Sequence, residues 1–406
     1  MSLVEAGGRP YGGAPGPLAL MPPSESGYAP HHGEPSVGEV DLDWGIVEAV
    51  ATRLAGAPPV GFTEGVSTLI ADFEGATSFA ELLVSELTGL YPKAGPARVL
   101  VISRAGWVKA NIAIFRHYLS PVAARLTPPS PALSRSASTL PAYASIIDDV
   151  VRTGLSAVRG AARSVVSAQI GIVLGFLSKR VLGQYDLVLP EDGKDSVYYV
   201  GPNIVNAERQ FGFGRKEFRM WIALHETAHR AQFTGVEWLK GYFNDLVENL
   251  MAGSYIDPKA FASALRRMAE AIIQGRDPLG DTGLAGMFAS DEQLERMRRL
   301  QALMCVLEGH GNFVMDTIGE RVIPDARRMS QILRERRASS GLQRILFRLL
   351  GIDTKLKQYE LGERFVKAVV ERAGLRTFCA IWNDPANLPT LEEIEDPPRW
   401  LARVTA

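Results

Sequence analysis

Five consecutive residues of this chain have the types and the spacing that a hydrolytic metal site requires. His225 and His229 are four residues apart, and Glu226 follows the first of them, which makes the pattern HExxH. Residues four apart on a helix lie one turn above each other on the same face, so both imidazoles can hold one zinc ion. Glu226 would then stand beside the metal-bound water as a general base. The pattern therefore predicts a zinc centre with two histidine ligands and a catalytic carboxylate.

The residues around this pattern predict a helix that is largely buried. Apolar residues recur at helical spacing together with the two histidines. They are Phe218, Trp221, Ile222 and Ala228. Gly214 precedes the segment and Gly235 follows it, and both are plausible helix boundaries. Buried histidines need partners for their ring nitrogens, and a metal ion supplies one, so the burial favours the metal site.

A catalytic zinc site needs a third protein ligand, and Glu308 is the strongest candidate. Apolar residues spaced three or four apart predict a second helix from about Ser290 to Ile318. Glu308 lies on its buried stripe, one turn after Met304 and one turn before Gly311. A carboxylate buried there needs a strong partner, because an unpaired charge is costly to bury. A zinc ion would be such a partner, and an arginine is the alternative.

Two other third ligands are weaker. Glu237 is close in sequence but lies beyond the expected end of the HExxH helix. His310 is on the same helix as Glu308 and points about 200° away from it. It would reach the metal only if that helix were broken at Gly309 and Gly311. The metzincin subclass is excluded, because its glycine and histidine are replaced by Gln232 and Gly235.

Several polar residues could assist the metal. A hydrolytic site needs a donor for the oxyanion that forms on the substrate. The candidates are Tyr198, Tyr199, Tyr255 and His310. Asn312 and Asp316 follow Glu308 by one and two turns, and either could orient a metal-bound imidazole or simply lie on the helix surface.

Three longer strings resemble a known family. LHETAHRAQF, LEGHGNFVMD and LPTLEEIEDPPRWLARV are similar to the zinc-dependent metalloproteases of actinobacteria, one branch of which is labelled as associated with biosynthesis of the deazaflavin coenzyme (factor 420). The resemblance spans about Val40 to Val404. It implies a zincin-like, mainly helical fold with His225 and His229 as ligands and Glu226 as the catalytic carboxylate. Glu308 matches the downstream glutamate of the family, which is the gluzincin arrangement.

The resemblance is less informative about His310 and about the substrate. The family often has an aromatic residue near the position of His310, so the role of this histidine is open. The family brings no substrate with it. We expect a zinc-dependent hydrolase, specifically a metallopeptidase that acts on a peptide. The alternatives are a hydrolase of a small amide in deazaflavin coenzyme metabolism and a catalytically silent scaffold protein with a zincin fold.

Composition limits the setting of this chemistry. The chain has 406 residues, 46% of them hydrophobic, and a net charge of −1. It can bury a large core, and nothing predicts binding to nucleic acid or to an acidic membrane. Cys305 and Cys379 are its two cysteines, which fits a reducing cytoplasm rather than a disulfide framework. The apolar stretch Ala168–Leu177 is too short for a transmembrane span, so we expect a buried helix there.

The elements that position the site follow from the remaining pattern. We expect a mainly α fold with a small β element. The predicted helices are Asp43–Leu54, Val66–Leu90, Gly106–Leu119, Ile146–Leu182, Ala260–Gln274 and Lys355–Ala373. Two short strands are predicted at Leu187–Pro190 and Ser196–Val200, and a loop at Thr127–Tyr143.

These elements suggest four regions. Residues 1–40 are rich in glycine and proline, have no secretory signal and are expected to form a disordered tail. Residues 41–185 form a helical region, residues 186–320 the zincin-like catalytic region, and residues 321–406 a helical C-terminal region.

Overall fold

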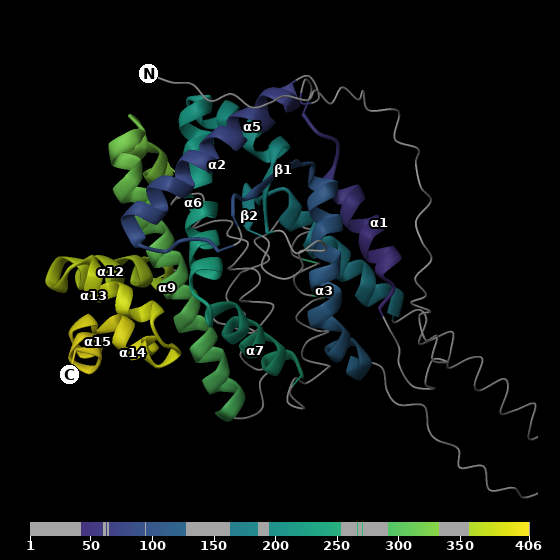
Figure 1. Ribbon diagram of the computed structural model, residues 1–406. Coiled ribbons are helices and arrows are strands. Elements are labelled where there is room, and N and C mark those ends of the chain that lie inside the picture. Colours follow the sequence, from purple (N-terminus) through teal and green to yellow (C-terminus); the bar gives the residue numbers. More distant parts are fainter. Residues whose placement is uncertain are drawn as a thin grey trace, which may run out of the picture. The chain divides into compact units, whose positions relative to one another are not determined.

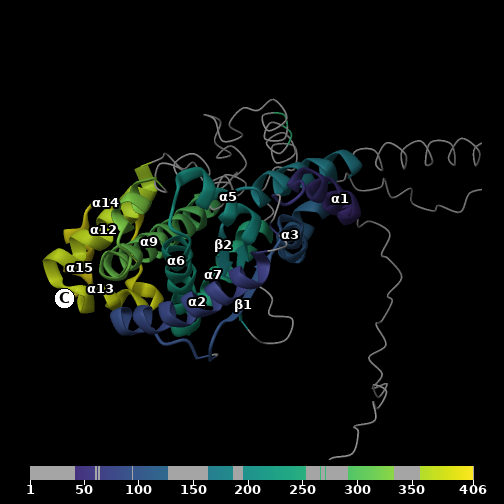
Figure 2. The same ribbon diagram turned by 90° about the horizontal axis from the view of Figure 1, so that it is seen from above.

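The described part of the chain is mainly helical with a small β element, as predicted, and this element is a three-stranded sheet (Figures 1 and 2). The computed structural model describes residues 42–126, 163–185, 195–252, 291–332 and 357–405, apart from residues 60, 61, 63, 64 and 94, together with residues 266 and 270. Five predicted elements lie wholly or partly outside these residues. They are the tail at residues 1–40, the loop Thr127–Tyr143, the first part of the helix Ile146–Leu182, the strand Leu187–Pro190 and nearly all of the helix Ala260–Gln274.

The sheet has the strand order β1-β3-β2. Strand β3 (Ser196–Val200) is central; β1 (Arg98–Ile102) pairs with it in parallel and β2 (Gly183–Tyr185) pairs with it antiparallel. Strand β1 was not among the elements predicted from the sequence, which placed Arg98–Ile102 in a helical region at residues 41–185. A short apolar run such as Arg98–Ile102 is compatible with either state, and pairing with a distant strand decides it.

Helices cover both faces of this sheet. On one face, Gln184 of β2 accepts a hydrogen bond from the indole of Trp107 (2.7 Å) and donates one to Asn111 (3.0 Å), both in α3 (Arg104–Leu126). On the other face, Tyr185 stacks with Phe233 of α6 (Arg215–Gly235) at 6.3 Å between ring centroids. Successive residues of a strand point to opposite faces, which explains this division.

Helix α6 is the central element for the site. It packs against α2 (Val66–Thr88) and against α9 (Asp291–Val322), and α7 (Leu239–Ala252) follows it. Buried Arg230 of α6 donates to Asp195 (2.6 and 3.1 Å) at the start of β3 and to Glu81 of α2 (2.7 Å). This network ties the helix to the sheet and to α2. Buried charges require such pairing.

Helix α9 also packs closely against α12 (Lys357–Ala373). An added Cβ at Gly309 would lie 2.4 Å from the backbone of Gly362, and one at Gly362 would lie 2.1 Å from the carbonyl oxygen of Cys305. The backbones of α9 and α12 are therefore in contact at Gly309 and Gly362. The helix α9 runs without a break through Gly309, so the break that would turn His310 toward a metal is not present.

The apolar stretch Ala168–Leu177 lies in a helix at residues 163–178, which packs on α1 (Trp44–Ala55). An added Cβ at Gly171 would lie 2.8 Å from the Val47 carbonyl oxygen, so the backbones are close. Ile170, Val173, Leu174 and Leu177 are buried, as predicted. No helix among the described residues is long and apolar enough to cross a membrane.

The remaining helices of the described residues are short. They are α5 (Gly201–Phe211), α13 (Leu375–Cys379), η3 (Ala380–Trp382), η4 (Pro385–Asn387), α14 (Leu391–Glu395) and α15 (Pro397–Val404). Thr390 and Glu393 form a capping box at the start of α14, and Trp400 of α15 is fully buried. Helices α14 and α15 pack on α12, where the ring of Trp400 meets Phe365 edge-on, and they join the common core.

Candidate metal centre

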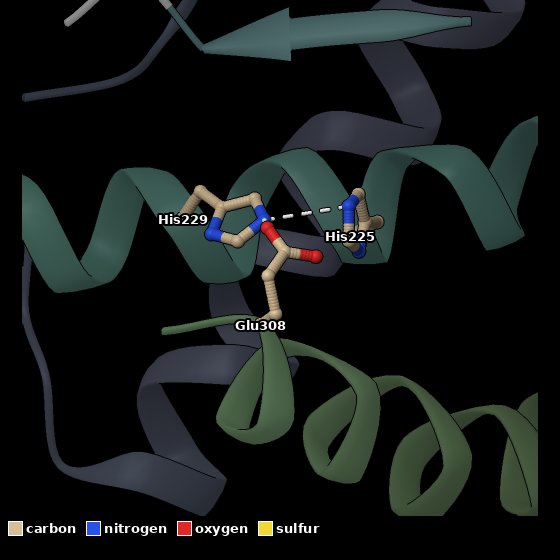
Figure 3. Close-up of side chains that lie close together, drawn as sticks. All are labelled: His225, His229 and Glu308. Atoms are coloured by element: carbon tan, nitrogen blue, oxygen red, sulfur yellow. Dashed lines mark hydrogen bonds and ion pairs between the residues drawn. The ribbon is translucent and has the colours of Figure 1, made fainter. Parts of the chain in front are cut away.

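Helix α6 presents both histidines of the HExxH pattern on the side that faces α9 (Figure 3). The Nε2 atoms of His225 and His229 lie 3.3 Å apart. His225 is partly buried, and Glu226 and His229 are buried. Two ring nitrogens that face each other at this distance need a proton or a cation between them, since both otherwise present lone pairs.

Glu308 of α9 reaches this pair from the opposite side, and its carboxylate points toward the imidazoles (Figure 3). Its Oε1 atom lies 3.3 Å from Nε2 of His229, and the side chain is buried. One ligand atom from each of the three residues lies within 4.8 Å of the others. Zinc bonds of about 2.0–2.1 Å in a tetrahedron place neighbouring ligand atoms about 3.3 Å apart. The two 3.3 Å separations fit this geometry.

Gly311 is the residue of α9 that lies against both imidazoles of the cluster. An added Cβ there would lie 3.5 Å from Cε1 of His229 and 3.9 Å from Nδ1 of His225. A methyl group would fit, but any longer side chain would extend over the imidazoles. Glycine at this position therefore lets the backbone of α9 approach both rings closely.

The electrostatics of the cluster favour a cation. Burial disfavours the charged form of His229, but the Glu308 carboxylate outweighs it, with a smaller contribution from Glu226, and the pKa of His229 is raised to about 9. A carboxylate that stabilises an imidazolium at this point would also stabilise a metal ion in its place. The negative potential at His229 comes from two carboxylates, Glu308 of α9 and Glu226 of α6.

Gln232 is a further residue of the site that the sequence analysis did not identify as functional. Its Oε1 atom lies 3.0 Å from Nδ1 of His229, and its Nε2 atom lies 3.0 Å from the carbonyl oxygen of Leu307 and 2.8 Å from Nδ1 of His310. The sequence held one signal for it, namely its position one turn after His229 in the same helix. The partners on α9 could not be read from that spacing.

His310 is not part of the metal cluster. Its ring is fully buried, stacks on Phe378 at 5.5 Å between centroids and meets Trp382 edge-on at 5.3 Å. Burial, helped by the charge of His229, lowers the pKa of His310 to about 3. The ring is therefore neutral at physiological pH and contacts the site through Gln232.

The carboxylate of Glu226 lies against the edge strand β2. An added Cβ at Gly183 would lie 2.6 Å from Oε1 of Glu226, so only glycine leaves room for this carboxylate. Gly183 pairs with Tyr199 of β3, and β2 is the last strand of the described sheet. The candidate base is thus next to a strand edge.

The other predicted residues lie in different settings. The hydroxyl of Tyr199 is hydrogen-bonded to Thr77 at 2.7 Å and its ring stacks on Phe73, so it belongs to the core. Burial raises the pKa of Tyr199 far above its usual range. Glu237 is exposed and pairs with Lys93 at the surface. This surface pair removes Glu237 from the set of third-ligand candidates.

The four other candidates are Tyr198, Tyr255, Asp316 and Asn312. Tyr198 is half-buried in β3, and Tyr255 lies outside the described residues. Asp316 accepts hydrogen bonds from Ser330 (3.0 Å) and Lys367 (3.4 Å). Asn312 is buried on α9. The sequence suggested that Asn312 or Asp316 would orient a metal-bound imidazole. For His229, the residue that contacts the ring nitrogen Nδ1 is Gln232.

Comparison with known proteins gave a family match and one similar solved structure. A crystal structure of a candidate hydrolase with a novel fold from Chloroflexus aurantiacus is similar, with a TM-score of 0.65 and 28% identity, over 90% of this chain and 99% of that one. No curated protein matches the sequence. The model of the family described as zincin-like metallopeptidase matches residues 42–401. The chain therefore belongs to the zincin-like metallopeptidase family.

Proposed function

We propose that this protein is a zinc-dependent peptidase in which His225, His229 and Glu308 hold the metal and Glu226 is the general base. The observation that carries the proposal is the meeting of the three ligand atoms from α6 and α9 within 4.8 Å of one another. Two imidazoles and one carboxylate are the ligand set of many catalytic zinc sites, whereas structural sites usually have four protein ligands. The ligand set therefore favours a gluzincin-type catalytic centre.

The residues of the chain have separate tasks in this proposal. Zinc, when bound, supplies a Lewis acid that makes water more acidic and polarises the carbonyl group of the substrate. Glu226 accepts a proton from the attacking water at its carboxylate and passes it to the leaving amine. Two observations support this role: the carboxylate lies against Gly183 of the edge strand, and its charge acts on His229. Burial of Glu226 excludes bulk water and supports this role.

The edge strand supports a peptide substrate. Strand β2 pairs with β3 on one side, and its other edge pairs with no strand among the residues that the structure describes. An extended peptide can add to such an edge through backbone hydrogen bonds. A peptide on this edge would pass next to Gly183 and hence next to Glu226, so a scissile bond could be brought to the base.

The proposal is tested by metal content and by one substitution. The purified protein should contain zinc in near one-to-one ratio, and His225→Ala should reduce it. Glu226→Gln should retain the zinc and lose hydrolysis of peptides, because the amide cannot accept the proton. A wild-type protein without bound zinc, or an active Glu226→Gln variant, would contradict the proposal.

The substrate class is decided in the same experiment. Wild type and Glu226→Gln are screened on a peptide library and on the amide-bearing intermediates of deazaflavin coenzyme metabolism. Turnover of peptides is the expected result. Turnover of the small amides instead would assign the site to that metabolism, and no turnover of either with full zinc would favour a scaffold role.

The free thiols Cys305 and Cys379 support a reducing compartment such as the cytoplasm for the active protein.

A further inference from the structure

The orientation of the Gln232 amide is determined by its surroundings. One end of the amide lies 3.0 Å from the carbonyl oxygen of Leu307, a group that can only accept hydrogen bonds. The atom at that end must therefore be the Nε2 amino group. It follows that the other end, which faces His229, is the Oε1 oxygen, in agreement with its 3.0 Å contact to Nδ1.

This orientation selects one tautomer of His229. The Oε1 oxygen of Gln232 accepts only, so Nδ1 of His229 must carry the proton and donate it. In a neutral ring with the proton on Nδ1, the lone pair is on Nε2. Nε2 is the atom that lies 3.3 Å from both Nε2 of His225 and Oε1 of Glu308. Gln232 thus turns the lone pair of His229 toward the candidate metal position.

The second amino hydrogen of Gln232 is bound as well. Nε2 of Gln232 lies 2.8 Å from Nδ1 of His310, and it can donate one hydrogen to this ring and the other to Leu307. The His310 ring is itself held by Phe378 and Trp382. With both hydrogens and the oxygen of its amide engaged, Gln232 cannot rotate without losing hydrogen bonds in a buried place, which is costly.

We propose that Gln232 is a positioning residue that holds His229 in the tautomer required for zinc binding, and that His310 and the Leu307 carbonyl lock the Gln232 amide in place. This inference rests on the proposed metal site. It gives His310 a purpose without making it a ligand. The partner that orients a ligating histidine commonly contributes about 10- to 100-fold to metal affinity.

Zinc affinity, measured by competition with a chromogenic chelator, tests the proposal without an activity assay. Gln232→Met should bind zinc about 10- to 100-fold more weakly than wild type. His310→Phe keeps the ring packing and the hydrogen bonds of Gln232 to His229 and to the Leu307 carbonyl. The zinc affinity of this variant should therefore fall by only a few-fold. Gln301→Met removes another buried glutamine, two turns before Glu308, and should leave affinity unchanged. Equal affinity of Gln232→Met and wild type would overturn the proposal.

A direct readout comes from nitrogen-15 NMR of histidine-labelled, zinc-loaded protein. The wild type should show His229 with its proton on Nδ1, exchanging slowly with water, and Nε2 shifted by the metal. A proton on Nε2 of His229 would overturn the proposal even if Gln232→Met failed to fold. If His310→Phe lost its zinc as completely as Glu308→Ala, His310 would be a ligand, and this result would also overturn the proposal. A wild type that binds no zinc would instead reject the metal site itself.

Discussion

Gly183 of the edge strand and the carboxylate of Glu226 are in direct contact, with no room for a side chain between them. An added Cβ at Gly183 would lie 2.6 Å from Oε1, 2.7 Å from Cγ and 2.8 Å from Cδ of Glu226. Gly183 is held in register by its pairing with Tyr199. The strand that could bind a substrate therefore also limits where the candidate base can lie.

The first prediction concerns this contact. Gly183→Ala should lower the turnover of a peptide substrate on the order of 100-fold, because the methyl group displaces the Glu226 carboxylate by about an ångström. Zinc content should be unchanged, since no ligand is touched. Gly75→Ala is the control: that glycine of α2 has nothing within 4 Å of an added Cβ, and turnover should stay at the wild-type level. Full activity of Gly183→Ala would show that the strand does not position the base.

The third ligand is tested by paired substitutions on α9. Glu308→Ala should weaken zinc binding by at least about one order of magnitude, because it removes a ligand from the site. It should also destabilise the fold, since the substitution opens a gap on a packed helix. His310→Ala should retain zinc. The measurement is metal content after dialysis against a weak chelator. The opposite pattern, with zinc lost only from His310→Ala, would refute the assignment of Glu308.

Arg230 is predicted to be important for stability rather than for chemistry. Arg230→Met removes the buried partner of Asp195 and Glu81 and should lower the free energy of unfolding by about 3–5 kcal/mol. Urea unfolding followed by circular dichroism measures this change. Arg327→Met, which breaks the exposed pair with Glu320, should leave the unfolding midpoint unchanged. Similar midpoints for the two variants would argue against the buried network.

The fourth prediction concerns thiol reactivity and its pH dependence. Burial, followed by the charge of Glu308, raises the pKa of Cys305 to about 12. The thiolate is the reactive form, so at pH 8 the folded protein should leave Cys305 unmodified by iodoacetamide, and unfolding in urea should expose it. Raising the pH from 7 to 9 should not increase the modification of folded protein. Mass spectrometry of the peptides locates the label, and rapid labelling of Cys305 at pH 8 would contradict its burial.

Much of the fold was accessible from the periodicity of the sequence. The helices Val66–Thr88, Arg215–Gly235 and Asp291–Val322 were predicted to within a few residues, because their apolar residues repeat at the helical period over many turns. Strand Arg98–Ile102 was missed. Five residues are too few for a period to be recognised, and their state depends on parallel pairing with Ser196–Val200 far along the chain.

In the candidate site, too, the local spacing could be read from the sequence, whereas contacts between separate helices could not. The spacing of His225 and His229 is a property of one helix, so the sequence by itself determined that two imidazoles share a face and that Glu226 lies next to them. Glu308 could be proposed from the buried stripe of its helix and from family resemblance. Its approach to within 3.3 Å of His229 depended on how α6 and α9 pack.

Gln232 and Gly183 show what only the tertiary structure decided. The role of Gln232 depends on the Leu307 carbonyl and on the His310 ring, and that of Gly183 on the Glu226 carboxylate, all of them brought near by packing between separate elements. Hydrogen-bond partners and close backbone approaches between distant segments leave no periodic trace in a sequence. A helical period records which side of a helix is buried, whereas the partner it meets there is set by the packed fold.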